Sequence, residues 1–206
     1  MSRALVNSAL YVIRFAGAAA ALWGIAYAIN GATQAGGYIT VQATPTPEAA
    51  DHLRLSGVRL PADVALLHQG EVPLHIWGST VAEQVLSRAD VLLSGLCAGA
   101  AAWLLHALLN SIAEGRPFDR RNPARTAWLA TLAIVSSLGS LLPAFAGAAV
   151  LDRAGLAGEF LPSFNPSWAP LAGGGLLLSL ALALHAGART LIAAGQASQS
   201  APRTSS

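Results

Sequence analysis

The chain has 206 residues, of which 54% are hydrophobic and only 11% are charged, and its formal net charge is +2 at pH 7. An ordinary soluble domain carries about 25% charged residues, so this composition argues against a water-soluble core and favours a membrane protein. The twelve basic residues other than histidine are all arginines that lie near predicted helix ends, which argues against direct nucleic-acid binding. The single cysteine, Cys97, excludes an intrachain disulfide and a metal site built from several cysteines.

The first apolar segment covers residues 5–29 and reaches the length of a spanning helix only if it includes Arg14. That side chain would then extend to the cytoplasmic headgroups. The alternative is a cleaved signal peptide, because the start is basic, the centre is apolar and Ala26-Tyr27-Ala28 has the A-x-A form of a cleavage site. Residues 1–29 are thus either the first transmembrane helix or a removed leader.

Residues 30–88 contain four of the eleven prolines, three of the five histidines and short apolar runs separated by turn residues. Gly37–Ala43 and Val72–Trp77 are predicted to be strands, with Pro73 on an edge strand. Residues 51–58 and 64–68 are weaker strand candidates. We expect a small extracytoplasmic β-rich cap between the first and second transmembrane helices.

Three further apolar segments follow, residues 91–112, 127–151 and 171–192, each long enough to cross a bilayer. The first is rich in small residues, which let helices approach closely within one chain or between copies in a homo-oligomer. Pro143 predicts a kink in the second. The final segment, residues 193–206, is small and polar and is predicted to be a disordered cytoplasmic tail.

The predicted fold class is therefore an all-α membrane protein with four transmembrane helices. Its predicted parts are the first transmembrane helix, the β-rich loop, transmembrane helices two to four and the tail, covering residues 1–29, 30–88, 89–192 and 193–206. The loop between the third and fourth helices has aromatic residues that we expect at the height of the membrane interface. They are Phe160, Phe164 and Trp168.

The polar segment Ser111–Arg125, called the strap below, separates the second and third transmembrane segments and holds four of the twelve arginines. Gly115 and Pro117 are typical of a helix end, whereas Asn122 followed by Pro123 is typical of an N-cap and a first helical turn. One interpretation is a well-capped connector; the other is a contact surface for anionic lipid or a cytoplasmic protein. The residues assigned to that surface are Gly115, Pro117, Phe118, Arg120, Arg121, Asn122 and Arg125.

The arginines also predict the orientation. With the strap inside, eight of the twelve arginines lie on the cytoplasmic side and four lie outside. The positive-inside rule then places both termini in the cytoplasm and the chain in the plasma membrane as a multi-pass protein.

Two histidines lie within predicted spans, His106 in the second and His185 in the fourth, at similar distances from the cytoplasmic end. If they faced each other they could ligate a haem or share a proton, whereas a neutral histidine bonded to a neighbouring helix is the simpler interpretation. The remaining histidines lack the spacing of a metal site, so no metal and no cofactor is predicted. Those in residues 30–88 are His52, His68 and His75.

Residues 112–118, with Asn122 following, and a fourth span ending in Gly187 with Leu191 after it resemble an uncharacterised family of bacterial four-span membrane proteins, domain of unknown function 2975. That family's pattern is Gly-x-Pro-Phe, then Asn, at the inner end of the second helix. The resemblance implies a membrane protein of unknown activity, in some genomes encoded beside a small helix-turn-helix regulator that is a candidate cytoplasmic partner.

The leading hypothesis is a non-enzymatic integral membrane protein that senses, regulates or tethers through its strap. The alternative is a haem-binding membrane redox protein that uses His106 and His185. A small transporter is the third hypothesis, disfavoured because no acidic residue lies within any predicted span.

Overall fold

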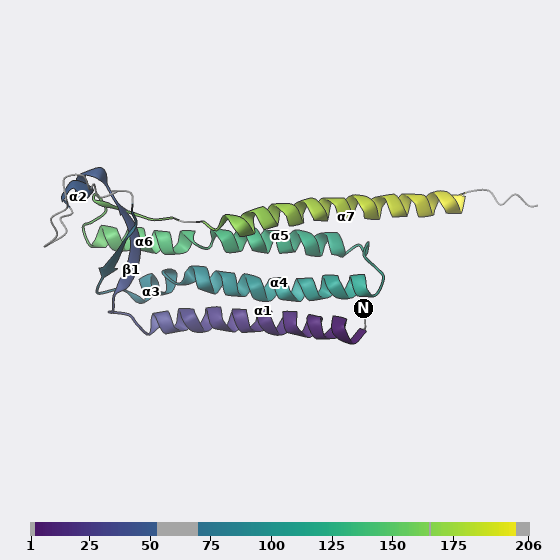
Figure 1. The fold of residues 1–206 in the computed structure, drawn as a ribbon, viewed down its shortest axis with the longest axis horizontal. Helices are drawn as coiled ribbons and strands as arrows, with labels where there is room; N and C mark the ends of the chain where they lie inside the picture. Colours follow the sequence, from purple (N-terminus) through teal and green to yellow (C-terminus); the bar gives the residue numbers. More distant parts are fainter. Residues whose placement is uncertain (1–2, 53–69, 165, 201–206) are drawn as a thin grey trace, which may run out of the picture. The chain divides into compact units, whose positions relative to one another are not determined.

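The computed structural model describes residues 3–52, 70–164 and 166–200 (Figure 1). The long helices are α1 (Arg3–Ala32), α4 (Ala89–Ala113), α5 (Asn122–Leu138), α6 (Leu141–Arg153) and α7 (Trp168–Ser200). The short elements are β1 (Ile39–Pro45), α2 (Pro47–His52), β2 (Val72–Ile76), α3 (Val81–Leu86) and β3 (Phe160–Pro162). They form two compact units, described separately below: unit 1 covers residues 1–23, 94–137 and 167–206, and unit 2 covers residues 24–93 and 138–166.

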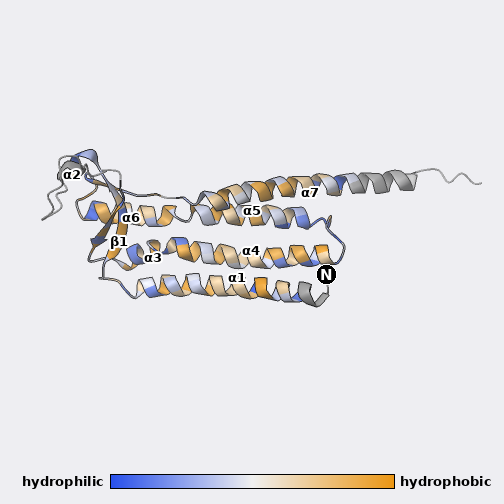
Figure 2. Cartoon of the chain, in the orientation of Figure 1, coloured by the Kyte–Doolittle hydropathy of each residue, from blue (hydrophilic) through white to orange (hydrophobic). Residues whose placement is uncertain are grey.

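Four helical segments of the described chain are long and apolar enough to cross a membrane, as the hydropathy pattern predicts. They are Asn7–Ala32, Ala89–Ala113, Asn122–Arg153 and Trp168–Thr190. Figure 2 shows hydrophobic residues along the length of these helices. A helix that is apolar all round suits an apolar solvent such as lipid.

Unit 1 is helical, and small residues mark where its helices meet. A Cβ added to Gly17 of α1 would collide with the methyl group of Ala102 on α4, and one added to Gly99 would lie 3.0 Å from the Cβ of Ala21. On α7, a Cβ at Gly174 would lie 2.8 Å from Cγ1 of Ile134 on α5. The predicted small-residue packing of the second span is thus confirmed within one chain.

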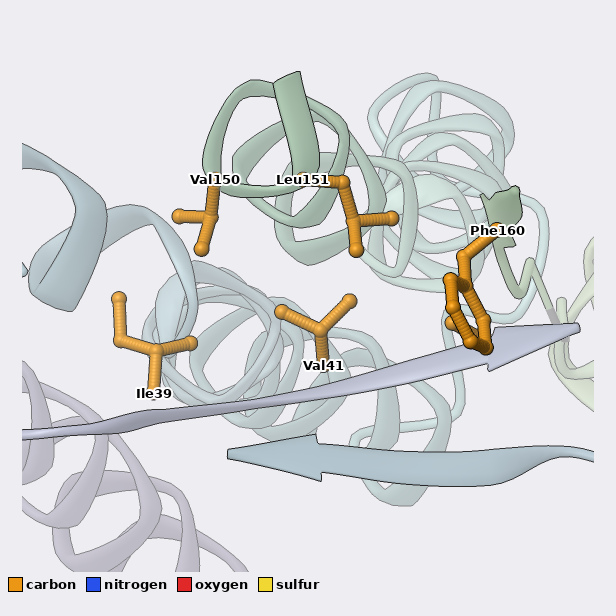
Figure 3. Close-up of a cluster of buried hydrophobic side chains, with 6 residues drawn as sticks. Ile39, Val41, Val150, Leu151 and Phe160 are labelled. Atoms are coloured by element: carbon orange, nitrogen blue, oxygen red, sulfur yellow. The ribbon is translucent and has the colours of Figure 1, made fainter. Parts of the chain in front are cut away.

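Unit 2 contains a three-stranded antiparallel sheet in the order β2-β1-β3. Alternate residues of β1 are buried, as expected for a strand with one face on a core. Figure 3 shows Ile39 and Val41 of β1 pointing toward Val150 and Leu151 of α6. The predicted strands are confirmed within two residues at each end, and Pro73 lies on β2, an edge strand of this sheet.

Three predictions for the loops need correction. The third strand, β3, comes from the loop between the third and fourth apolar segments, so the sheet is not built from residues 30–88 alone. Phe160 on that strand is 7% exposed in the core, and not an interface aromatic. Residues 51 and 52 belong to helix α2, and the weaker strand candidates at 53–58 and 64–68 lie outside the described residues.

The third apolar segment is interrupted as Pro143 predicts, but the break precedes the proline. Helix α5 ends at Leu138 and α6 begins at Leu141, which places Pro143 in the first turn of α6, where a missing N–H is tolerated. Helix α7 continues to Ser200, so the prediction of a disordered tail is wrong for residues 193–200. That segment contains three alanines and two glutamines, which are good helix formers.

Candidate functional site

The strap is organised around the Asn122 side chain, which is completely buried. Its amide group donates hydrogen bonds to Ser111 Oγ at 3.1 Å, to the carbonyl of Arg116 at 3.2 Å and to the carbonyl of Pro117 at 3.0 Å. The predicted N-cap role is therefore wrong, because the Asn122 side chain bonds the preceding turn and not the amides of its own helix. It joins the end of α4 to the start of α5.

The carboxylate of Asp119 accepts a hydrogen bond from the backbone N–H of Arg121 at 2.9 Å, which forms an Asx turn just before α5. This bond, helped by the neighbouring arginines, lowers the pKa of Asp119 from its ordinary value. Arg125 is part of the same connection, because one guanidinium nitrogen donates to Asn122 Oδ1 at 3.0 Å and to the carbonyl of Ala107 at 3.1 Å. Arg125 thus stabilises the strap from within.

Some of the other strap residues pack against neighbouring helices, and others are exposed. Gly115 ends α4 with a φ of +77°, a conformation that favours glycine, as predicted for the helix stop. The ring of Phe118 lies over Gly187 of α7, where an added Cβ would be 3.1 Å from Cε1 of the ring. Arg116 pairs with Glu114. Arg120 and Arg121 are exposed, so they are the strap side chains best placed to contact lipid or protein.

The two membrane-segment histidines have different surroundings. His106 on α4 faces α1, where Arg14 NH1 lies 3.5 Å from its Nε2. His185 on α7 is exposed, and no hydrogen bond in the described part of the chain joins it to His106. The haem hypothesis stays a prediction. The serines of α5 form packing contacts: Ser136 Oγ donates to Ser94 Oγ at 3.2 Å, and Ser137 bonds the carbonyl of Ser167.

Unit 2 contains a cavity of about 740 Å³ that sequence reasoning did not find. Ligand pockets of small molecules are typically about 300–1,000 Å³. The lining combines aromatic, amide and hydroxyl side chains with one arginine. Its residues are Tyr27, Gln34, Ala35, Gly37, Tyr38, Ile39, Thr40, Trp77, Gln84, Ser87 and Arg88.

Gln84 fixes the polar wall of this cavity and is only 1% exposed. Its Nε2 donates to Ser79 Oγ at 2.7 Å and lies 3.2 Å from the carbonyl oxygens of Gln34 and Tyr38. Its Oε1 accepts a hydrogen bond from Arg88 NH1 at 2.6 Å. A buried amide with both ends bonded holds one rotamer, so the cavity wall is preorganised.

Arg88 supplies the charge of the cavity. Its NH2 donates to Gln34 Oε1 at 2.6 Å, and its guanidinium carbon lies 5.6 Å from the centre of the Tyr27 ring. A Cβ at Gly31 of α1 would collide with the Arg88 side chain, so glycine is needed there for the two segments to approach. The side chains that accept hydrogen bonds from Arg88, Gln34 and Gln84, are both neutral amides. They therefore do not neutralise the positive charge that Arg88 brings to the cavity wall.

Aromatic rings supply the apolar part of the same cavity lining. The Tyr38 ring stacks on His75 with centroids 4.8 Å apart and meets Trp77 edge-on at 5.0 Å. Trp77 is 67% exposed although it belongs to this cluster. The cavity lining therefore combines aromatic rings with amide groups and one guanidinium.

Comparison of the chain with family models, with curated proteins and with solved structures finds no match. The resemblance of the strap to a bacterial four-span family stays a prediction.

Proposed function

We propose that this chain is a non-enzymatic, multi-pass protein of the plasma membrane that senses a small amphipathic anion in its unit 2 cavity. We place that cavity on the outer side, and the strap and both termini in the cytoplasm, on the positive-inside argument. The single observation that carries the proposal is the cavity of about 740 Å³ with one arginine and three aromatic rings in its lining.

The lining favours a ligand with two parts. A carboxylate or phosphate group would be neutralised by Arg88, which is held in place by Gln34 and Gln84. A ring or other flat apolar body would pack against Tyr38 and Trp77. Polar groups that converge on one point of a ring-lined cavity fix the orientation of a small molecule.

The proposed output is a change in how the strap is presented. Helix α4 begins one residue after Arg88, and Ser111 near its other end accepts a hydrogen bond from Asn122 of the strap. A displacement of Arg88 by the ligand would be transmitted along this continuous helix to the strap. The exposed Arg120 and Arg121 would then change their contact with anionic lipid or with a cytoplasmic protein, of which a small helix-turn-helix regulator is one candidate.

The test uses the full chain in lipid nanodiscs, titrated with indole-3-carboxylate and with the neutral indole-3-carboxamide as the matched probe. We expect the carboxylate to bind, measured by saturation-transfer NMR, and the carboxamide to bind at least tenfold more weakly. The variant Trp77→Ala should weaken carboxylate binding about tenfold, because one stacked aromatic contributes on the order of 1 kcal/mol.

Trp168→Ala is the matched control, because Trp168 is 73% exposed but does not line the cavity. It should leave carboxylate binding unchanged. Equal binding of the two probes, or equal effects of the two tryptophan substitutions, would overturn the ligand assignment.

A further inference from the structure

Arg14 is an unusual residue because it lies inside the apolar segment Asn7–Ala32 of α1. Among the described residues, no carboxylate forms an ion pair with it. A guanidinium in such a segment costs several kcal/mol unless it reaches water, pairs with an anion or is otherwise stabilised. The contacts around Arg14 therefore indicate what compensates its charge.

The contacts that Arg14 does make are with neutral groups on α4. Its guanidinium carbon lies 4.8 Å from the centre of the Trp103 ring, and NH1 is 3.5 Å from Nε2 of His106. An arginine can only donate, so Nε2 of His106 accepts and the ring carries its hydrogen on Nδ1. In the described part of the chain that Nδ1 atom is buried without a hydrogen-bond partner. The site thus has donors and positive charge but lacks an anion.

A cavity of about 220 Å³ opens beside these groups. Four of its six lining residues have polar uncharged side chains, one is Arg14 and one is apolar. They are Asn7, Leu10, Tyr11, Arg14, His106 and Asn110. The nearest acid along α4, Glu114, already accepts hydrogen bonds from Asn110 and Arg116, so it does not neutralise Arg14. Amide and hydroxyl donors around one guanidinium suit a phosphate group.

We propose that this cavity binds the phosphate group of an anionic membrane lipid. The lipid source, and not a free phosphate ion, follows from the flanks of the cavity: Tyr11 is 73% exposed, Val12 66% and Phe15 78%, all on α1. These side chains would lie along the acyl chains while Arg14 holds the headgroup. The Trp103 ring and His106 hold the guanidinium so that its remaining N–H groups are free to donate to phosphate oxygens.

The experiment measures lipid binding to the full purified chain by native mass spectrometry, with phosphatidylglycerol against phosphatidylcholine. The wild type should bind phosphatidylglycerol at least tenfold more tightly, and Arg14→Gln should remove most of that preference. Arg189→Gln is the matched control, because Arg189 is an exposed arginine of α7 that does not line the cavity. It should keep the preference.

A second variant and a competition with inorganic phosphate test the same site independently. Asn7→Leu retains the charge and should weaken phosphatidylglycerol binding by a smaller factor, so the site remains testable if Arg14→Gln fails to fold. Inorganic phosphate, added in excess over the lipid, should not displace phosphatidylglycerol; displacement would assign the cavity to a free anion and contradict the lipid source. Equal losses in Arg14→Gln and Arg189→Gln would overturn the site altogether.

Discussion

The two units differ in what lies at their centres. The largest completely buried side chains of unit 2 are Leu151, Val150 and Gln84, whereas those of unit 1 are polar, Asn122 and Thr126. Unit 2 has a cluster of β-sheet and helix side chains like that of a water-soluble domain. Unit 1 has small-residue contacts between helices and a polar connection at its strap. The hydrophobic effect therefore stabilises unit 2, whereas close helix contacts and buried hydrogen bonds stabilise unit 1.

Both units nevertheless expose large apolar side chains. They include Phe15 at 78%, Leu176 at 74% and Leu182 at 66% in unit 1, and Phe145 at 68% and Trp77 at 67% in unit 2. Exposed apolar surface on this scale marks an interaction site or a membrane-facing surface. Truncating a core side chain of unit 2 should therefore cost more than truncating an exposed one of unit 1, and three further predictions test what stabilises each unit.

The largest effect is expected from Leu151→Ala in unit 2. Leu151 is 1% exposed, so removing three carbons leaves a cavity and should cost about 2–5 kcal/mol of unfolding free energy. The matched substitution Leu182→Ala removes the same atoms from a side chain that is 66% exposed and should have little effect. Thermal unfolding in nanodiscs measures both. Equal costs would mean that unit 1 has a hidden core, which contradicts the comparison.

The next prediction concerns close helix contact in unit 1. Gly17→Ala places a methyl group against Ala102 and should separate α1 from α4, at a cost of about 1–3 kcal/mol. Gly173→Ala is the control, because an added Cβ there meets nothing within 4 Å. The control should be neutral or slightly stabilising, since alanine is a better helix former than glycine. A neutral Gly17→Ala would show that these helices do not depend on their small residues.

The third prediction tests the polar connection. Asn122→Ala leaves the carbonyl of Pro117 without its donor and removes one of three donors to the carbonyl of Arg116, which should cost about 1–3 kcal/mol. The backbone amides of residues 115–122 should then exchange faster with deuterium. Asn110→Ala is the control: Asn110 is an exposed asparagine that bonds only Glu114 in the described structure. If both variants exchange alike, the strap is held by something other than Asn122.

The smallest effect is expected at Glu83, the third residue of α3. Its carboxylate accepts a hydrogen bond from the backbone N–H of Thr80, the N-cap of α3, and its own N–H donates to the Thr80 hydroxyl, which together form a capping box. The same carboxylate bonds Arg153 of α6 at 3.1 Å and 3.2 Å. The hydrogen bond from the backbone N–H of Thr80 is the largest cause that lowers the pKa of Glu83 below its ordinary value of 4.5. Desolvation, the next largest, opposes it, and Arg153 lowers the pKa further. A lowered folded pKa adds stability above the ordinary value, and that stability is lost as the pH falls through the folded pKa.

The variant Glu83→Gln should lose about 1 kcal/mol at neutral pH, the usual size of a capping contribution. Its unfolding temperature should also fall less than that of the wild type on acidification below pH 4.5. Circular dichroism at a series of pH values gives both quantities. Parallel pH profiles for the two proteins would exclude the capping box and the Arg153 pair as the source of this stability.

The sequence predicts the elements of this fold better than its sites. Period-2 alternation locates β1, and hydropathy locates the four apolar helices, because both signals are local. Strand β3 is only three residues long, which is too short to show a period, so its pairing with Pro45 and Thr44 was missed. The sequence Asn122-Pro123 is typical of an N-cap. In the structure, however, the Asn122 amide donates to the carbonyls of Arg116 and Pro117 in the preceding turn.

The large cavity could not be predicted for a different reason. Tyr27 lies in α1, Tyr38 just before β1, Trp77 just after β2 and Arg88 just before α4, and no local pattern joins them. Gln84 looks like an ordinary surface residue of a short helix in the sequence, yet it is the buried centre of the polar wall. These residues share one site because Gln84 of α3 bonds the backbone carbonyl of Tyr38, next to β1, a contact between distant parts of the sequence.

The most direct test of the account asks whether the cavity and the strap lie on opposite sides of a membrane. In a Cys97→Ala background, single cysteines are introduced as Ala82→Cys, on the exposed side of α3, and Arg120→Cys, in the strap. We predict that an impermeant maleimide labels the first in intact cells and the second only after permeabilisation. Labelling of both cysteines in intact cells, or the reverse pattern, would contradict the proposed sensor.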